Sequence, residues 1–152
     1  MTPRRTLSAA LYAAYCQTTY RVHLPDGPYD LKVGATHPAF DAALDALGVA
    51  SWGFISAANP MSQAVDPHVN HAQHDALIQA AQRMGYPVFP GLGIPENDAW
   101  DSEPSLCVCN ISAPALQKLG IQFRQNAAVW GAVRGAAQFV WCLGLPPHGG
   151  TS

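Results

Sequence analysis

Two short segments of alternating hydrophobic residues, joined by a compact turn, place the strongest constraint on how this chain folds. Residues 20–24 alternate like a β-strand, and residues 29–33 can return beside them. The turn between them, Pro25-Asp26-Gly27-Pro28, suits a reversal because proline presets φ and glycine tolerates positive φ. The sequence therefore predicts a β-hairpin near the N-terminus, and with it an antiparallel sheet.

Helical and strand patterns alternate along the rest of the chain. Helices are predicted over residues 7–16, 36–47, 66–84 and 112–119, the last one ending before Gly120, and further strands over 51–57, 87–91 and 105–111. Residues 127–133 and 136–141 flank Arg134-Gly135, which predicts either a closing hairpin or a C-terminal helix. We therefore expect an α+β fold in which three to four helices pack on a largely antiparallel sheet.

Length and composition indicate one globular domain. A chain of 152 residues fits one domain better than two, and its 49% hydrophobic content is enough to form a core. We assign residues 1–145 to a single α+β domain and residues 146–152 to a disordered tail. The segment 91–104, rich in Gly, Pro, Asn and Asp, is predicted to be a long loop with a functional role.

The charge pattern argues against several kinds of partner. The net charge is −2 and the eight basic residues are scattered, so we expect no nucleic-acid binding. The apolar runs are shorter than the roughly 20 residues of a membrane span. The apolar stretch 7–16 lacks a cleavage site, so we expect a cytoplasmic protein. Charged residues make up only 12%, against about 25% in typical proteins, and such a surface favours a homo-oligomer.

Polar side chains at the ends of predicted elements are the first candidates for a ligand-binding site. Asn59 follows the strand over 51–57, and the inward stripe of the 66–84 helix, traced backwards by helical steps, reaches His74 and then Asn70. Amide groups recognise neutral polar ligands through paired donors and acceptors. The structural alternative is that Asn70 caps the helix and His74 makes an ordinary hydrogen bond.

Glu103 is the strongest candidate for acid–base chemistry. It is one of only two glutamates, and it stands between the long loop and a buried strand, just before Pro104, which holds it extended. A carboxylate at a strand end can act as a general base or anchor a ligand amine. Trp100 could form an apolar wall that raises the pKa of Glu103 by desolvation. The structural alternative is a carboxylate that accepts backbone N–H bonds.

Gln125, Asn126 and Trp130 complete the predicted ligand-binding residues. The two amides enter the segment that leads to Trp130, and with Asn59 and Asn70 they form a set of neutral amides. Such a set favours recognition over nucleophilic chemistry. The sequence holds no nucleophile elbow, phosphate-binding glycine loop or dinucleotide fingerprint, so no cofactor is predicted.

The histidines and cysteines raise the question of a metal. His68, His71 and His74 follow a His-x-x-His-x-x-His pattern, but helical steps of three place the outer two about 120° apart. Cys107 and Cys109 share one face of a strand, where buried small hydrophobes explain them better than metal ligands do. No metal site is predicted, and a metal-dependent hydrolase using the histidines is kept as a third alternative.

Four motifs along the chain resemble a known family. They are the run Phe54-Ile55-Ser56-Ala57-Ala58-Asn59-Pro60, Asn70 at a helix start, Trp100-x-x-Glu103-Pro104-Ser105, and Phe123-Arg124-Gln125-Asn126-Ala127. Over about residues 10–142 the chain resembles the bacterial domain-of-unknown-function family numbered 3293. Family members often carry an arginine one turn into the helix after the asparagine, whereas this chain has His71-Ala72-Gln73-His74 there. The resemblance implies a small bacterial cytoplasmic domain with a shared polar site and no established activity.

Three classes of function stay open at this point. The first is a small-molecule-binding domain whose pocket is lined by Asn59, Asn70, Glu103 and Gln125, with a tryptophan as a wall. In an enzymatic version, Glu103 is the general acid or base. The second is a non-catalytic protein-interaction module, and the third is the metal-dependent hydrolase. The first class predicts that the four polar residues converge in one cleft, and the second predicts a large exposed apolar patch.

Overall fold

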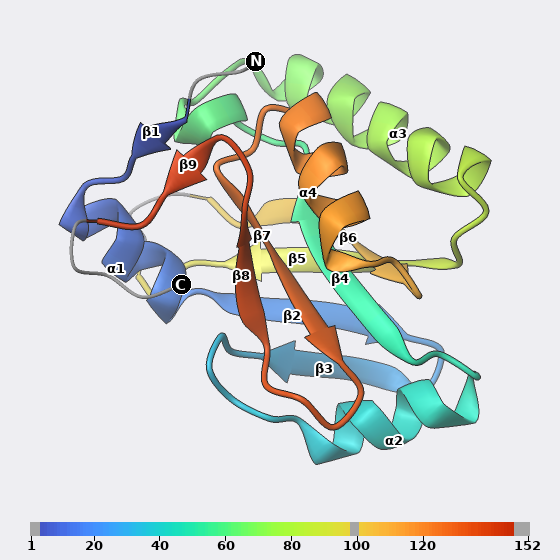
Figure 1. Ribbon diagram of the computed structural model, residues 1–152. Coiled ribbons are helices and arrows are strands. Elements are labelled where there is room, and N and C mark those ends of the chain that lie inside the picture. The colour runs from blue at the N-terminus through green and yellow to red at the C-terminus, as the bar shows by residue number, and fades with distance from the viewer. Residues whose placement is uncertain (1–3, 98–100, 148–152) are drawn as a thin grey trace.

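A seven-stranded antiparallel sheet forms the centre of the computed structural model, which describes residues 4–97 and 101–147. Its strands, in spatial order, are β3 (Gly27–Leu31), β2 (Thr19–Leu24), β5 (Val88–Ile94), β6 (Glu103–Cys109), β4 (Ser51–Ser56), β7 (Ala127–Ala132) and β8 (Gln138–Trp141). The predicted hairpin β2–β3 forms one edge, and a second hairpin, β7–β8, forms the other (Figure 1). The C-terminal segment is therefore a hairpin and not a helix, and the predicted α+β fold is confirmed.

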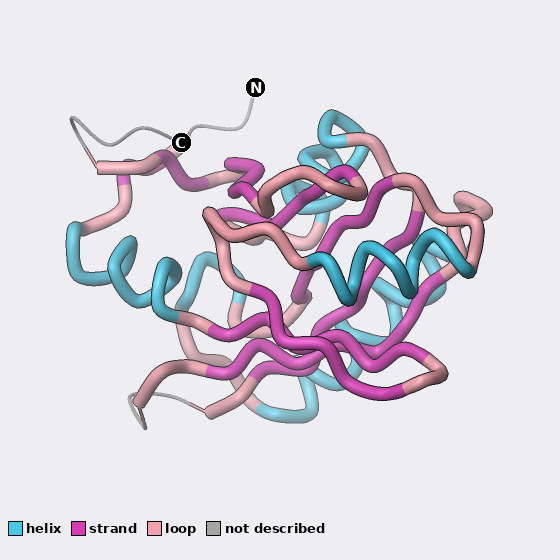
Figure 2. The backbone as a smooth tube through the Cα atoms, turned by 90° about the horizontal axis from the view of Figure 1, so that it is seen from below, coloured by secondary structure: helices cyan, strands magenta, loops and turns pink. Residues whose placement is uncertain are grey.

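Helices cover both faces of this sheet. α1 (Ala9–Gln17) and α2 (Pro38–Ala46) pack on one face, whereas α3 (Pro67–Arg83) and α4 (Ala113–Gln122) pack on the other. Figure 2, turned by 90°, shows the strands running between the helical segments. A short 3-10 turn, η1 (Pro60–Ser62), follows β4. The side chains of Ser8, Asp66 and Ser112 each accept a backbone N–H of the first turn, which fixes where three of the helices begin.

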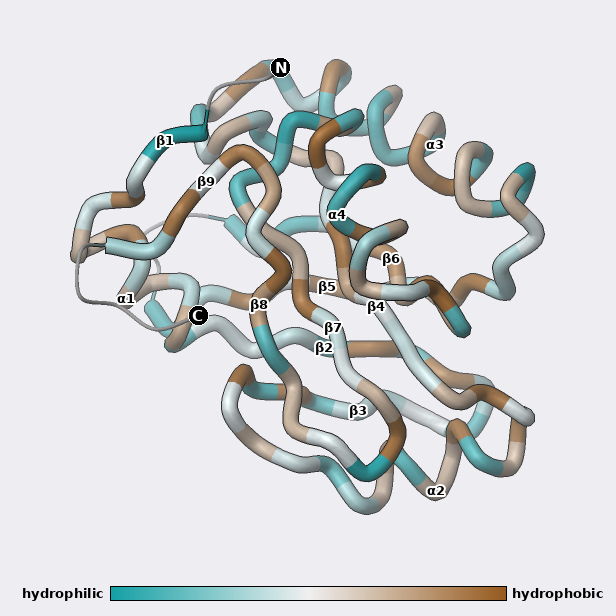
Figure 3. Tube along the Cα trace, viewed as in Figure 1, coloured by the Kyte–Doolittle hydropathy of each residue, from teal (hydrophilic) through white to brown (hydrophobic). Residues whose placement is uncertain are grey.

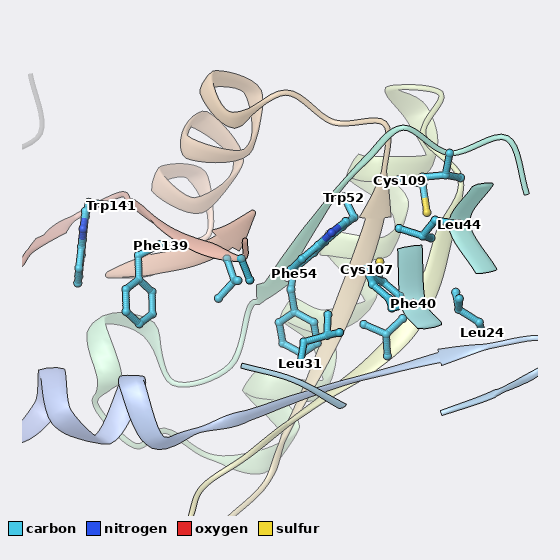
Figure 4. Packing of buried hydrophobic residues seen from close by; sticks show 14 of the residues in the cluster. Leu24, Leu31, Phe40, Leu44, Trp52, Phe54, Cys107, Cys109, Phe139 and Trp141 are labelled. Atoms are coloured by element: carbon cyan, nitrogen blue, oxygen red, sulfur yellow. The ribbon is translucent and has the colours of Figure 1, made fainter. Parts of the chain in front are cut away.

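The alternation of side chains along the strands divides the buried hydrophobic residues into two clusters. On β4, Trp52 and Phe54 belong to the cluster on the α1/α2 face, and Ile55 belongs to the cluster on the α3/α4 face. Figure 4 shows the first cluster, in which Trp52 packs edge-on against Phe40 of α2. In the second cluster Leu77 is fully buried, and Figure 3 shows hydrophobic and polar residues alternating along its helix, α3.

The two edges of the sheet approach each other, so the sheet is curled. The Gly34 N–H donates to the Ala137 carbonyl at 2.8 Å, and the Ala137 N–H donates to the Ala35 carbonyl at 3.0 Å. These bonds join the segment after β3 to the residue before β8, and the cluster containing Trp52 lies on the inner side of the curl. A separate parallel pair, β1 (Arg5–Thr6) with β9 (Gly144–Leu145), ties the two terminal segments together.

Two local predictions were wrong, and in both the cause is a close approach of neighbouring atoms. Residues 91–94 continue β5, so the predicted loop over 91–104 shortens to residues 95–102, of which 98–100 lie outside the described residues. At Gly91 a Cβ would stand 2.7 Å from the Phe54 ring, so glycine suits this strand position. Likewise α4 continues through Gly120, where a Cβ would overlap the Cys142 sulfur.

The chain ends give little further structure. Of the predicted tail 146–152, residues 148–152 lie outside the described residues, and residues 146–147 form neither helix nor strand. Within the described ranges no helix combines the length and the hydrophobicity needed to cross a membrane.

Candidate functional site

Glu103 occupies the first position of β6, where the strand pairing opens a space in front of it. Gly93 of β5 pairs with Glu103 on one side and with Tyr20 of β2 on the other. Because Gly93 has no side chain, the space between Tyr20 and Glu103 stays open, and a Cβ there would meet no atom closer than 3.8 Å. This opening belongs to a cavity of about 200 Å³.

The cavity lies between the inner face of the sheet and α1. Its apolar lining includes Leu11, Phe54, Ala127, Val129 and Phe139. Its polar lining includes the neutral side chains of Tyr15, Tyr20, Asn59, Ser62 and Gln125. Among the lining residues that the structure describes, Glu103 alone carries a full charge. The cavity therefore combines one carboxylate with otherwise neutral walls.

Asn59 holds the Glu103 carboxylate in place. Its Nδ2 donates to Oε2 of Glu103 at 2.8 Å, and its Oδ1 accepts from Nδ2 of Asn70 at 2.9 Å and from the Val65 N–H at 3.3 Å. The Asn59 backbone N–H donates in turn to Oδ1 of Asn70 at 2.8 Å. These four bonds fix the orientation of the Asn59 amide and present its donor to the carboxylate.

Tyr15 connects α1 to the turn that follows β4. The Tyr15 and Ser62 hydroxyls are hydrogen-bonded to each other, and Nδ2 of Asn126 donates to both, at 3.1 Å and 3.3 Å. The Tyr20 hydroxyl donates to the Tyr15 carbonyl at 2.9 Å. Asn126 thus reaches the site through its partners, although it does not itself line the cavity.

The turn over residues 59–62 is strained. Asn59, Met61 and Ser62 all have positive φ, a conformation that costs on the order of 1–3 kcal/mol when forced on a residue other than glycine. Besides the Asn59 and Ser62 contacts, the Met61 N–H donates to the Arg124 carbonyl at 2.7 Å. The neighbouring elements therefore hold a turn that places both Asn59 and Ser62 at the cavity.

Gln125, which lies in the segment between α4 and β7, forms part of the cavity wall. Its buried Nε2 donates to the carbonyls of Ala58 and Phe123, both at 3.2 Å. The structure thus brings Asn59, Glu103 and Gln125 to one cavity, with Asn70 bonded directly behind Asn59.

Burial sets the electrostatics of the cavity. Desolvation raises the pKa of Glu103 above its ordinary value, and the hydrogen bond from Asn59 opposes this rise. Desolvation also raises the pKa of Tyr15 and of Tyr20, and the negative charge of Glu103 adds to both shifts, so these hydroxyls stay neutral. Among the described residues Glu103 forms no ion pair with a lysine, arginine or histidine.

Four described residues predicted to bind a ligand do not line this cavity. Asn70 and Asn126 only contact residues that do, whereas Trp130 and His74 lie on the other side of the sheet. Trp130 follows Val129 by one position on β7 and therefore lies on the opposite face of the sheet, where its Nε1 donates to the Ile111 carbonyl at 2.8 Å. His74 lies on α3, over that same opposite face. Burial lowers its pKa, and its Nδ1 has no hydrogen-bond partner among the described residues. The predicted wall residue Trp100 lies outside the described residues.

The histidine pattern does not assemble into a metal site. His68 and His71 are exposed, and His71 lies 3.5 Å from Asp75. Within residues 4–97 and 101–147 no three His, Cys, Asp or Glu side chains are grouped closely enough to hold a metal ion. All four cysteines are free, and Cys107, Cys109 and Cys142 are buried.

Sequence reasoning missed Tyr15, Tyr20 and Ser62. Two patterns were available: Tyr20 alternates with the inward-facing Val22, and Tyr15 stands one helical turn after Leu11. Both patterns indicate only that a side chain faces inward, and neither separates a cavity from a packed core. Ser62 has no sequence signal, because its place depends on the unusual backbone of the turn.

The comparison with known families concerns the segment that carries most of this polar network. Residues 55–128 match the family model described as Protein of unknown function (DUF3293). Over this segment the chain is similar to DUF3293. The match covers just under half of the chain, includes Asn59, Asn70, Glu103 and Gln125, and confirms the resemblance seen in the sequence. No curated protein and no solved structure shows significant similarity to the chain.

Removing the side chain of Asn70, within the DUF3293 segment, should loosen the turn that carries Asn59. Asn70→Ala leaves the Asn59 N–H and Oδ1 without two of their partners. We expect the free energy of unfolding, measured by urea denaturation, to fall by about 1–3 kcal/mol. Gln73→Ala, an exposed change on the same helix, is the matched control and should stay within about 0.5 kcal/mol of the parent. Equal effects of the two changes would contradict the proposed role of Asn70.

Glu103→Gln should change how stability depends on pH. The native carboxyl holds its proton more tightly than the unfolded chain does, because its pKa is raised. The stability that this group contributes is therefore present below the ordinary glutamate pKa of about 4.3, and it is lost as pH rises through the higher native pKa. The variant suffers no such loss. Its free energy of unfolding minus that of the parent should become more positive as pH rises from about 4 to about 7.

Urea denaturation at several pH values measures this difference. Glu96→Gln, which removes the other glutamate of the chain at an exposed position, is the matched control. A difference for Glu103→Gln that stays flat, or that becomes more negative with rising pH, would show that burial does not raise the pKa of Glu103.

Proposed function

We propose that the protein binds a small organic molecule in the cavity in front of Glu103. The observation that carries this proposal is a single, partly buried carboxylate facing a cavity of about 200 Å³ whose other described lining residues are neutral. An engineered protein cavity of about 150 Å³ holds one benzene molecule. The size therefore suits a ligand of about one ring with a few further atoms.

The chemistry of the lining favours a ligand with an apolar body and a hydrogen-bond donor. Several hydroxyls at the cavity already donate within the protein: Tyr20 to the Tyr15 carbonyl, and Ser105 to the Glu103 carbonyl. Among described residues only Asn59 donates to the Glu103 carboxylate, which leaves it able to accept from a ligand. Phe54, Phe139 and their apolar neighbours would contact the rest of the ligand.

The competing interaction module has weaker support. It requires a large exposed apolar patch, and the exposed large hydrophobic residues of the described chain are Leu47, Val65, Val69 and Met84. Val69 and Met84 stand near opposite ends of α3, roughly 22 Å apart along the helix, so they do not form one compact patch.

The proposal places the protein in the bacterial cytoplasm, where four free cysteines would stay reduced. It allows either a monomer or a homo-oligomer.

A pair of one-ring probes tests the proposal. Benzyl alcohol offers a donor to Glu103, whereas benzoate presents a second negative charge to it. We expect benzyl alcohol to bind in the millimolar range by saturation-transfer NMR, and benzoate to bind at least about tenfold more weakly because like charges repel. Gly93→Val should abolish binding of benzyl alcohol, since the new side chain would project into the open space between Tyr20 and Glu103.

The folding of Gly93→Val is checked by its circular dichroism and its melting temperature. A Cβ at this position meets only ordinary contacts, so we expect the fold to be retained. Binding of benzyl alcohol that persists in folded Gly93→Val would place the ligand elsewhere and overturn the proposal.

A second candidate function is acid–base catalysis by Glu103 on the bound molecule. The raised pKa of this carboxyl favours such a role, because a general acid or base works best when its pKa lies close to the working pH. To test this role, the protein is incubated with a mixture of metabolites, and NMR shows whether one of them is consumed. Glu103→Gln should slow such a conversion by about 100-fold or more. Conversion at an unchanged rate in this variant would exclude the role.

A further inference from the structure

We infer that the cavity recognises a small organic ammonium ion, held between the Glu103 carboxylate and the aromatic rings of Tyr15, Tyr20, Phe54 and Phe139. This inference rests on the proposed function and specifies the chemical class of the ligand. Two independent features of the cavity lead to it, its charge and its aromatic lining.

The charge of the cavity is not balanced by the described protein. Glu103 accepts one neutral hydrogen bond from Asn59 and has no ion pair with a described basic residue. Its charge also reaches Tyr15 and Tyr20, whose pKa values it raises. A partly buried carboxylate is costly without a cationic partner. A ligand cation would supply that partner, whereas a neutral ligand would bury the charge further without compensating it.

The aromatic lining suits the same ligand. Tyr20 and Phe54 form an edge-to-face pair with ring centroids 5.3 Å apart, and Tyr15 and Phe139 form a tilted pair at 6.4 Å. All four side chains line the cavity. Aromatic faces attract cations, and rings gathered around one space are the usual way in which proteins bind quaternary ammonium groups.

An inorganic cation would not be satisfied in the same place. Calcium takes six to eight oxygen ligands, and magnesium requires near-ideal octahedral geometry. The described lining offers one carboxylate, and no group of three metal-ligating side chains occurs in the described residues. An organic ammonium ion needs no such coordination shell, because aromatic rings and one carboxylate are sufficient to bind it.

A pair of isosteric probes separates charge from shape. Choline and 3,3-dimethylbutan-1-ol have the same outline, but choline carries a quaternary nitrogen where the alcohol has a carbon. Isothermal titration at low ionic strength, and at a pH well above the ordinary range of a glutamate, should show choline binding at least about tenfold more tightly. Equal affinities of the two probes would overturn the ammonium inference.

Variants of Glu103 and Phe139 locate the source of the preference. In Glu103→Gln the affinity for choline should fall by at least about threefold, leaving only the preference that the rings supply, while the affinity for the alcohol should change little. Phe139→Leu keeps apolar volume but removes one ring. It should therefore lower the affinity for choline by about three- to tenfold and the affinity for the alcohol by less. Retention of the full choline preference in folded Glu103→Gln would overturn the inference.

The two levels of the proposal can fail separately. If benzyl alcohol binds but choline binds no more tightly than its neutral isostere, the cavity function stands and the ammonium inference falls. If benzyl alcohol, choline and the isostere all fail to bind, both fall. Gly93→Val completes the comparison, since it should abolish choline binding while leaving Glu103 and all four rings in the chain.

Discussion

The hydrogen bond from Asn59 to Glu103 joins the end of one central strand to the start of its neighbour. β4 and β6 run antiparallel, with Ser56 opposite Ser105, so the residues just beyond this pair meet where β4 ends and β6 begins. A hydrogen bond to a charged group contributes about 1.5–3 kcal/mol, which helps to keep the carboxylate in the cavity. The same bond fixes Asn59, whose left-handed backbone begins the strained turn that also places Ser62.

This meeting point is the part of the site that the sequence could predict. Asn59 follows a recognisable buried strand, Glu103 begins another, and Asn70 continues the inward stripe of an amphipathic helix. Polar residues at the ends of buried elements converge when those elements are neighbours, and an antiparallel sheet makes such neighbours common. The α+β fold and the edge hairpin β2–β3 followed from the same local signals, because turn chemistry and two-residue alternation act over a few residues.

The rest depended on contacts between distant segments. Trp130 is predicted as a pocket wall because the amides Gln125 and Asn126 lead into its strand, but a shift of one position along a strand turns a side chain to the opposite face. Residues 91–94 have a loop composition, yet they form a strand whose glycines leave room for Phe54 and for the cavity. Tyr15 reaches Asn126 across 111 positions of the chain, and no local pattern encodes such a contact.

The cavity draws its charge and its shape from different parts of the chain. Asn59, Asn70, Glu103 and Gln125 all lie within the segment that matches DUF3293. The four rings, at positions 15, 20, 54 and 139, all lie outside that segment. Since the rings stand on α1, β2, β4 and β8, replacing one of these ring side chains would reshape the space without removing the carboxylate or its Asn59–Asn70 support. In the proposed binding mode, the charge of the ligand is therefore set by other residues than those that limit its size.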